Sequence, residues 1–326
     1  RRAFFVPLGL ILRAGAALHE VGEFDRAFGA CGASKASAER GGRIGAAVAA
    51  ETEGLRLRYL AGRLEEGVDV AAEVERLLDR LAGLDDPDAL SRVWQLRLNT
   101  QIEACRWASA QEAAETVVRE ARRAGNDVLA VRTLPLLAFL AQKGPMPVAQ
   151  ARAACEAILA QVAGDRRSSS LAQLELAMVD AMSGDVASAR ARCASTRAAL
   201  VDLGWEMQAA LVSLSSGPIE LLADEPARAE AELARDLEAL ERMDERNFIS
   251  LTVVLLAEAR YRLRRFDEAA ALVARSREIA WPDDVAVQTY LATVGGKLDA
   301  RRGEVAAGLE QVAAGVALME ATDDPS

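Results

Sequence analysis

Turn-forming residues recur at nearly even intervals along this chain, and no other feature limits its possible folds as strongly. Clusters of Gly, Asp, Asn and Pro stand about forty residues apart, a period that indicates stacked helical repeats. The clusters are Gly41-Gly42, Asp85-Asp86-Pro87, Gly125-Asn126-Asp127, Gly164-Asp165, Leu203-Gly204, Met243-Asp244-Glu245, Pro282-Asp283-Asp284 and Asp323-Asp324-Pro325.

A second set of turns falls midway between these clusters. At each one, an apolar anchor follows a helix end and a small residue comes three positions later, as Trp107 and Ala110 do. The anchor can pack back onto the preceding helix, and the small residue lets two helices cross closely. Two repeats are irregular: one turns at Gly62-Arg63-Leu64 with Gly67 as the small residue, and one turns at Gly144 to Val148 with Ala151.

The segments between turns carry apolar residues at helical spacing. Leu233, Leu237 and Leu240 are separated by four and three residues, which places them on one side of a helix. The apolar 51% of the chain is mostly Ala, Leu and Val, and only 4% is aromatic, so strand-forming runs are scarce. We therefore predict an all-α fold, an α-solenoid of about eight helix-turn-helix units in a single domain, residues 1–326. The units lie near 1–41, 42–85, 86–126, 127–165, 166–204, 205–244, 245–283 and 284–326.

The midway turns resemble the tetratricopeptide repeat, or TPR. In that family a small residue precedes the turn, an aromatic residue follows it, and Ala comes three positions later. The matching positions are Trp94, Leu98, Trp107 and Ala110 in the third unit, and Gly15, Gly22, Phe24 and Ala27 in the first. The family's repeat is shorter, so this resemblance implies a TPR-like array with longer helices.

A narrower resemblance rests on the order of four stretches. They are Gly144 to Val148, Ser216 to Leu222, Trp281 to Gln288 and Asp299 to Glu304. In this order they resemble the C-terminal helical region of actinobacterial adenylate/guanylate cyclase–AAA ATPase–TPR multidomain regulators. Gly295 and Gly296 depart from the larger residues usual there, which implies a less regular last unit. No GxxxxGK[ST] phosphate loop occurs, so any cyclase or ATPase activity would belong to a parent protein.

Charge and hydropathy exclude two classes of partner. A net charge of −10 repels phosphate, so we expect no nucleic-acid partner. No stretch approaches the ~20 apolar residues of a membrane span, so we expect no membrane partner and a cytoplasmic location. Arg1 to Leu12 has some features of a signal peptide, but Pro7 and Arg13 interrupt it and we interpret it as part of the fold. Because the first residue is Arg, we expect the chain to be a piece of a longer protein.

The sequence contains no convincing catalytic or metal-binding constellation. The four cysteines are far apart and lack CxxC spacing, so we expect them to be buried apolar residues at helix contacts. His19 has no nucleophile in a matching motif. We interpret Asp85, Asp165 and Asp283 as helix caps. Arg262, Arg264 and Arg265 form a cluster that would suit a phosphate. We predict no catalytic residue, metal or cofactor in this chain.

The favoured function is a non-catalytic scaffold that binds a protein or peptide. By analogy with TPR arrays, Arg92, Gln95, Asn99 and Glu103 would line a concave partner-binding face. The resemblance to multidomain regulators implies a sensing or docking arm whose partner is an adjacent ATPase or cyclase domain of the same polypeptide. The alternative is a regulatory solenoid of a transcription-regulator type that takes a small effector into a deep, mainly apolar pocket.

Overall fold

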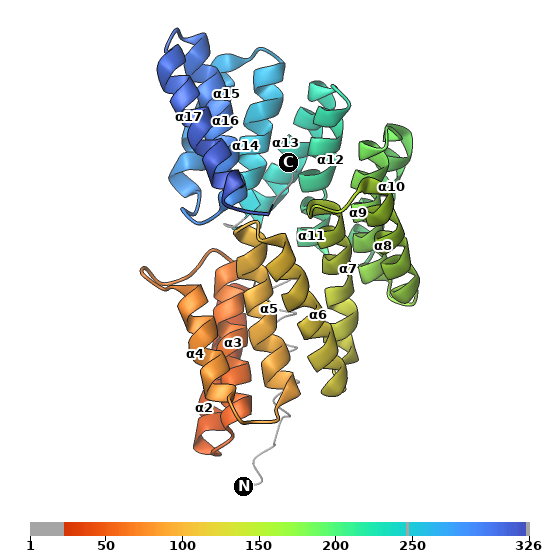
Figure 1. Cartoon of the computed structure of the whole chain (residues 1–326), viewed down its shortest axis with the longest axis vertical. Coiled ribbons are helices and arrows are strands. Elements are labelled where there is room, and N and C mark those ends of the chain that lie inside the picture. The colour runs from red at the N-terminus through yellow and green to blue at the C-terminus, as the bar shows by residue number, and fades with distance from the viewer. Residues whose placement is uncertain (1–22, 246–247, 324–326) are drawn as a thin grey trace. The chain divides into compact units, whose positions relative to one another are not determined.

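The computed structural model describes residues 23–245 and 248–323, and all regular structure in that part of the chain is helical (Figure 1). The helices are α2 (Phe24–Arg40), α3 (Ile44–Leu60), α4 (Val70–Leu81), α5 (Pro87–Glu103), α6 (Trp107–Arg123), α7 (Asp127–Lys143), α8 (Val148–Gln161), α9 (Arg166–Met182), α10 (Val186–Asp202), α11 (Glu206–Ala210), α12 (Ser213–Leu222), α13 (Pro226–Arg242), α14 (Phe248–Arg262), α15 (Phe266–Ile279), α16 (Val285–Arg301) and α17 (Val305–Glu320). The predicted all-α class is confirmed.

The commonest helix length, 17 residues, explains the long repeat period. The helices α5, α6, α7, α9, α10, α13 and α16 each contain 17 residues. A helix of that length extends about 25 Å at 1.5 Å per residue. Two such helices with two short turns make up about forty residues, in place of the shorter TPR period.

The described residues divide into two compact units. Unit 1 contains the described residues up to Thr100 together with Glu112–Thr133, and unit 2 contains Gln101–Gln111 together with residues from Leu134 onward. In unit 1, α2 packs on α3 and α3 packs on α4. In unit 2, hairpins form from α9 with α10, α12 with α13, α14 with α15, and α16 with α17. The arrangement of all units in one continuous array remains a prediction.

Apolar side chains at helical spacing form the core of unit 2. Leu233 and Leu240 of α13 are fully buried, and they belong to one cluster with Val253 and Leu256 of α14. Burial of each Leu side chain contributes roughly 1.5–3 kcal/mol. The helical periodicity of α13 is therefore confirmed. Among the described residues, no helix combines the length and apolarity that a membrane crossing requires.

Aspartate side chains cap several helix N-termini, with one correction in register. Asp165 accepts a hydrogen bond from the Ser168 amide at 2.7 Å, as predicted. At the other two sites the cap is the next residue: Asp86 accepts from the Ala89 amide and Asp284 from the Val287 amide, each at 3.0 Å. An Asp caps best from the position that immediately precedes the helix, and Pro87 already occupies the first helical position of α5.

The turn after α3 differs from the predicted one. We expected Gly67 to be the small residue at a helix crossing, but α3 ends at Leu60, α4 begins at Val70, and Gly67 lies in the connection with φ +81°. The positive φ explains the glycine, because other residues rarely adopt it. The other irregular unit is as predicted, since Ala151 is buried on α8 with 3% exposure.

The glycines of the last hairpin have a packing role. A methyl group on Gly296 of α16 would lie 2.5 Å from the carbonyl oxygen of Gly308 on α17. A methyl group on Gly308 would come similarly close to the backbone of Gly296. The two backbones therefore approach too closely for any side chain between them, which accounts for glycine where larger residues are usual.

Candidate partner-binding face

The first helices of successive hairpins lie side by side in unit 2: α9 contacts α12, α12 contacts α14, and α14 contacts α16 (Figure 1). One side of each helix faces the second helices. On α9 this side is marked by Asp180, whose carboxylate accepts hydrogen bonds from Arg152 of α8 at 2.6 Å and Arg192 of α10 at 2.7 Å. The opposite side of each first helix faces away from the second helices.

On α9 that opposite side carries Leu171, Glu175, Met178 and Met182. Their spacing of four, three and four residues places them on one side of the helix, roughly opposite Asp180. Leu171 and Met178 are half-buried, while Met182 is 47% exposed. The side-chain amide of Gln142 on α7 donates to the Met182 sulfur at 3.7 Å, so this surface continues onto α7.

The neighbouring first helices extend the same surface. In α12, Ser216 and Glu220 contact the second helices through Glu232 and Arg190, so Leu222 lies on the other side. Leu211 precedes α12, in the turn that follows α11, and is half-buried. Leu222 is 58% exposed. In α14, Arg260 bonds Glu230 of α13, and Leu251 lies on the opposite side and is half-buried. We call this surface the first-helix face and define it by Leu171, Glu175, Met178, Met182, Leu211, Leu222 and Leu251.

Buried carboxylates elsewhere in unit 2 are neutralised by ion pairs. Asp236 lies 2.7 Å from a guanidinium nitrogen of Arg197, and Glu258 lies 2.5 Å from the Lys297 ammonium. Pairing of this kind is the usual condition for burying a charge. The carboxylates that hold the hairpins together are therefore already engaged and offer little to a partner.

Glu175 is the exception on the first-helix face. Its half-buried carboxyl makes no hydrogen bond and no ion pair with the described residues. Burial raises the pKa of Glu175 to about 7, opposed only by the positive charge of Lys143 at the end of α7. An apolar surface that carries one unpartnered acidic group has the chemistry of a recognition site.

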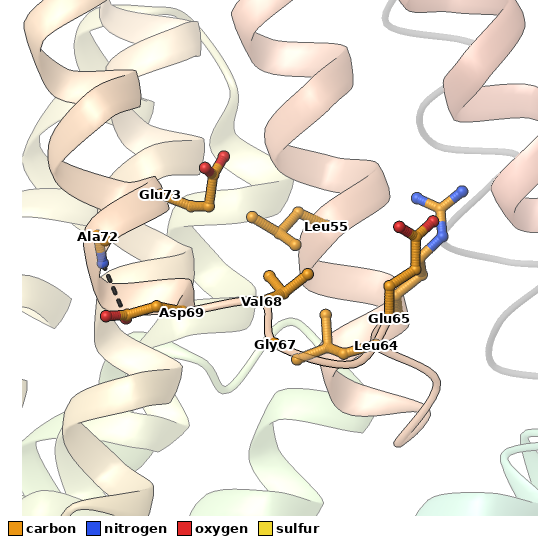
Figure 2. A pocket seen from close by; sticks show the side chains of 9 residues that line it. Leu55, Leu64, Glu65, Gly67, Val68, Asp69, Ala72 and Glu73 are labelled. Atoms are coloured by element: carbon orange, nitrogen blue, oxygen red, sulfur yellow. Dashed lines mark hydrogen bonds between the residues drawn. The ribbon is translucent and has the colours of Figure 1, made fainter.

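A separate hollow of about 560 Å³ lies in unit 1, beside the long connection between α3 and α4. Leu55, Leu64 and Val68 gather at its centre (Figure 2). Charged groups surround them: Asp69 and Glu73 on the α4 side and Glu65 on the other (Figure 2). Arg58 also lines the hollow. Asp69 is occupied in capping α4, because it accepts a hydrogen bond from the Ala72 amide at 3.0 Å.

The predicted face residues lie on α5, and the structure does not test whether they bind a partner. Arg92 is only 8% exposed and pairs with Asp88 at 3.2 Å and Glu53 at 3.6 Å. Gln95, Asn99 and Glu103 are half-buried. The side-chain oxygen of Asn99 is buried and has no hydrogen-bond partner among the described residues.

The predicted role of the cysteines is confirmed. All four are free and buried, and burial raises the pKa of Cys31, Cys155 and Cys193 to about 12. At such values the nucleophilic thiolate is rare at neutral pH. The described residues contain no group of His, Cys, Asp and Glu side chains arranged to hold a metal ion. His19 and Arg1 to Leu12 lie outside the described residues.

The arginine cluster near α15 is occupied by carboxylates. Arg262 bonds Glu258 at 2.9 Å, and Arg265 lies 2.6 Å from Glu230 and also pairs with Glu268. The Arg265 contacts join the start of α15 to α13, and the Arg262 contact lies within α14. The two arginines therefore act as structural cations, and a phosphate would have to displace glutamates that already neutralise them.

Comparison with solved structures finds the same fold. The chain matches a Rap protein complexed with competence and sporulation factor, with a TM-score of 0.67 and 10% identity, over 96% of this chain and 98% of that chain. It also matches a tetratricopeptide repeat protein from Parabacteroides merdae, with a TM-score of 0.51 and 13% identity, over 89% and 98% of the two chains. At these identities the likeness shows the fold, and it confirms the TPR-like prediction. No protein-family model and no curated protein sequence matches the chain.

Proposed function

We propose that this chain is a non-catalytic binding module that holds a segment of a protein or peptide on the first-helix face of unit 2. The observation that carries the proposal is the exposure of two large apolar side chains there, Met182 at 47% and Leu222 at 58%. The half-buried side chains of Leu171, Met178 and Leu251 on the same face also pack against the buried clusters of unit 2. Soluble proteins seldom leave neighbouring apolar side chains uncovered without an interaction to cover them.

The Rap protein of similar fold supports a binding role, because its structure contains a bound factor. Stacked helical hairpins present side chains from several helices on one continuous surface, and such a surface suits an extended or helical segment. Unbranched Met side chains adapt to partners of different shape, which favours recognition of a segment by its apolar positions. In unit 1, taken by itself, we propose Gln95 and Asn99 of α5 as hydrogen-bonding positions of a separate partner-binding surface, with Arg92 as a structural neighbour.

A peptide-display experiment tests the proposal. Random 12-residue peptides are selected on the purified chain, and the affinities of the enriched peptides are measured for the wild type, Met178→Glu and Leu222→Glu. We expect each substitution to weaken binding at least about tenfold, because a carboxylate must be desolvated against the apolar partner. Val201→Glu is the matched control, since Val201 on α10 is 57% exposed and lies on a second helix. Equal binding by all four proteins would contradict the proposal.

We further propose that the module is the docking or sensing arm of a larger signalling protein with an ATPase or nucleotide cyclase domain. The support is the order of the four sequence stretches described above. An antibody against this chain, used on an immunoblot of its source cells, tests this point. A band much heavier than 34.7 kDa is expected, and a band at 34.7 kDa would contradict it.

The hollow beside α4 favours a second candidate function, the binding of a small effector. Its volume of about 560 Å³ is within the usual range for small-ligand sites. Its carboxylates Glu65, Asp69 and Glu73 would favour a cationic molecule. Screening of cationic metabolites by thermal shift, with Leu55→Arg to fill the hollow, tests this candidate. A stabilising ligand whose effect survives Leu55→Arg would place its site elsewhere.

A further inference from the structure

Glu175 is the one feature of the first-helix face that has a charge and no partner. Its carboxyl is on the surface that also carries Leu171, Met178 and Met182, and it is half-buried. Asp180, five residues further along α9, faces the second helices and is held by two arginines at 2.6 and 2.7 Å. The same helix therefore carries one acid that joins hairpins and one that has no ion-pair partner among the described residues.

The groups around Glu175 do not neutralise it. The positive charge of Lys143 at the end of α7 acts to lower the pKa of Glu175, but the two side chains make no ion pair of 4 Å or less. Cys155 of α8 and Cys193 of α10 also lie within electrostatic range, and burial raises the pKa of both thiols to about 12, so both are neutral. A cation that reached Glu175 would meet a carboxylate with no competing bond.

We propose that Glu175 recognises a basic side chain, Lys or Arg, in the segment bound on the first-helix face, and that it acts as a specificity-determining residue. This inference rests on the proposed function. The apolar side chains on either side of Glu175 would hold apolar residues of the segment, and the basic residue between them would form a partly desolvated ion pair. A hydrogen bond to a charged group in such surroundings is stronger than one in water.

Protonation of Glu175 gives the proposal a second observable. The carboxyl titrates near neutral pH, whereas an exposed Glu is ionised at any pH above about 5. An ionised Glu175 attracts Lys, and a protonated one does not. The preference for a basic residue therefore strengthens between pH 6 and pH 8, which is the range in which a Lys side chain itself does not titrate.

The experiment uses two matched libraries of acetylated 12-residue peptides. The central position is Lys in one library and Gln in the other, and the remaining positions exclude Lys, Arg and His. The most enriched sequences are synthesised in both forms, and their affinities are measured at pH 6 and pH 8 for the wild type, Glu175→Gln and Met178→Glu. At pH 8 we expect the wild type to prefer the Lys form about tenfold. We expect that preference to fall severalfold at pH 6 and to disappear in Glu175→Gln at both pH values.

The outcomes separate this inference from the proposed function. If the peptides bind, Met178→Glu weakens them and the Lys and Gln forms bind the wild type equally, the binding face stands and the role of Glu175 is wrong. If Met178→Glu changes nothing, both are wrong. Should Glu175→Gln fail to fold, Lys143→Gln replaces it: removal of the nearby positive charge is expected to increase the Lys preference about threefold. An unchanged or smaller preference would then overturn the inference.

Discussion

Arg190 of α10 donates one hydrogen bond to each carboxylate oxygen of Glu220 on α12, at 2.8 and 2.6 Å. This two-bond contact joins the second helix of one hairpin to the first helix of the next. Glu220 is only 5% exposed, so loss of either member leaves a poorly solvated charge. The stacking of hairpins in unit 2 thus depends on specific ion pairs as well as on apolar packing.

Glu220→Ala is expected to lower the free energy of unfolding by about 1–3 kcal/mol, because Arg190 remains partly buried without its partner. Urea unfolding followed by circular dichroism measures the change. The control is Glu310→Ala on α17, where the side chain is exposed and the change should be within about 0.5 kcal/mol. Equal effects of the two substitutions would show that the Arg190 contact contributes nothing to stability.

The glycine contact between α16 and α17 makes a second prediction. Gly308→Ala should destabilise the protein by about 1–3 kcal/mol or more, because the new methyl group would lie 2.4 Å from the Gly296 carbonyl oxygen. Gly32→Ala on α2 is the matched control: no atom lies within 4 Å of the added methyl group. That change should stabilise the helix by about 0.5–1 kcal/mol. Opposite signs for the two substitutions are the expected result, and thermal unfolding reports them.

Glu175 should make stability depend on pH. Its pKa is raised by burial from 4.5 to about 7, so between these values the folded protein holds a proton that the unfolded chain has released. Stability therefore falls as pH rises through this window and does not recover above it. The Glu175→Gln variant has no carboxyl to ionise at this position, so it does not lose stability in this way. It should be more stable than the wild type by about 1–3 kcal/mol at pH 8 and equally stable near pH 4.5. A constant difference across this range would contradict the raised pKa.

The cysteines should be inert in the folded protein. Burial raises the pKa of Cys31, Cys155 and Cys193 to about 12, so neither access nor ionisation favours reaction at pH 8. We expect a thiol reagent to modify these residues only as fast as the protein opens, and all of them quickly in denaturant. Rapid labelling of any of the three under native conditions, detected by mass spectrometry of peptides, would show that its helix contact is open.

Local signals in the sequence were enough to predict the helical class. The turn clusters and the spacing of Leu233, Leu237 and Leu240 depend on neighbours along the chain, and the structure has the helices they indicate. The cap register was wrong by one residue at Asp86 and Asp284, because adjacent Asp residues are equivalent in sequence and only the backbone geometry distinguishes them. The role of Gly67 was wrong because a glycine in a loop and a glycine at a helix crossing look alike in sequence.

The first-helix face could not be found from sequence alone. Its definition requires knowing that Asp180 and Glu220 are engaged by arginines on other helices, and these partners are 12 to 30 residues away along the chain. Glu175 has no sequence feature that separates it from the paired acids. The arrangement of α7, α8, α9 and α10 around it shows that, of the two α9 acids Glu175 and Asp180, Glu175 has no ion-pair partner among the described residues. The binding role predicted for Gln95 and Asn99 stays a prediction.

Hydrogen–deuterium exchange with a display-selected peptide reports where the partner binds. We expect slower exchange in α9 around 171–182, in α11 and α12 around 211–222, and in α14 near Leu251, with little change in α10 and α13. Protection confined to residues 55–73, beside the hollow of unit 1, or to second helices alone would contradict the proposal that the first-helix face binds the partner.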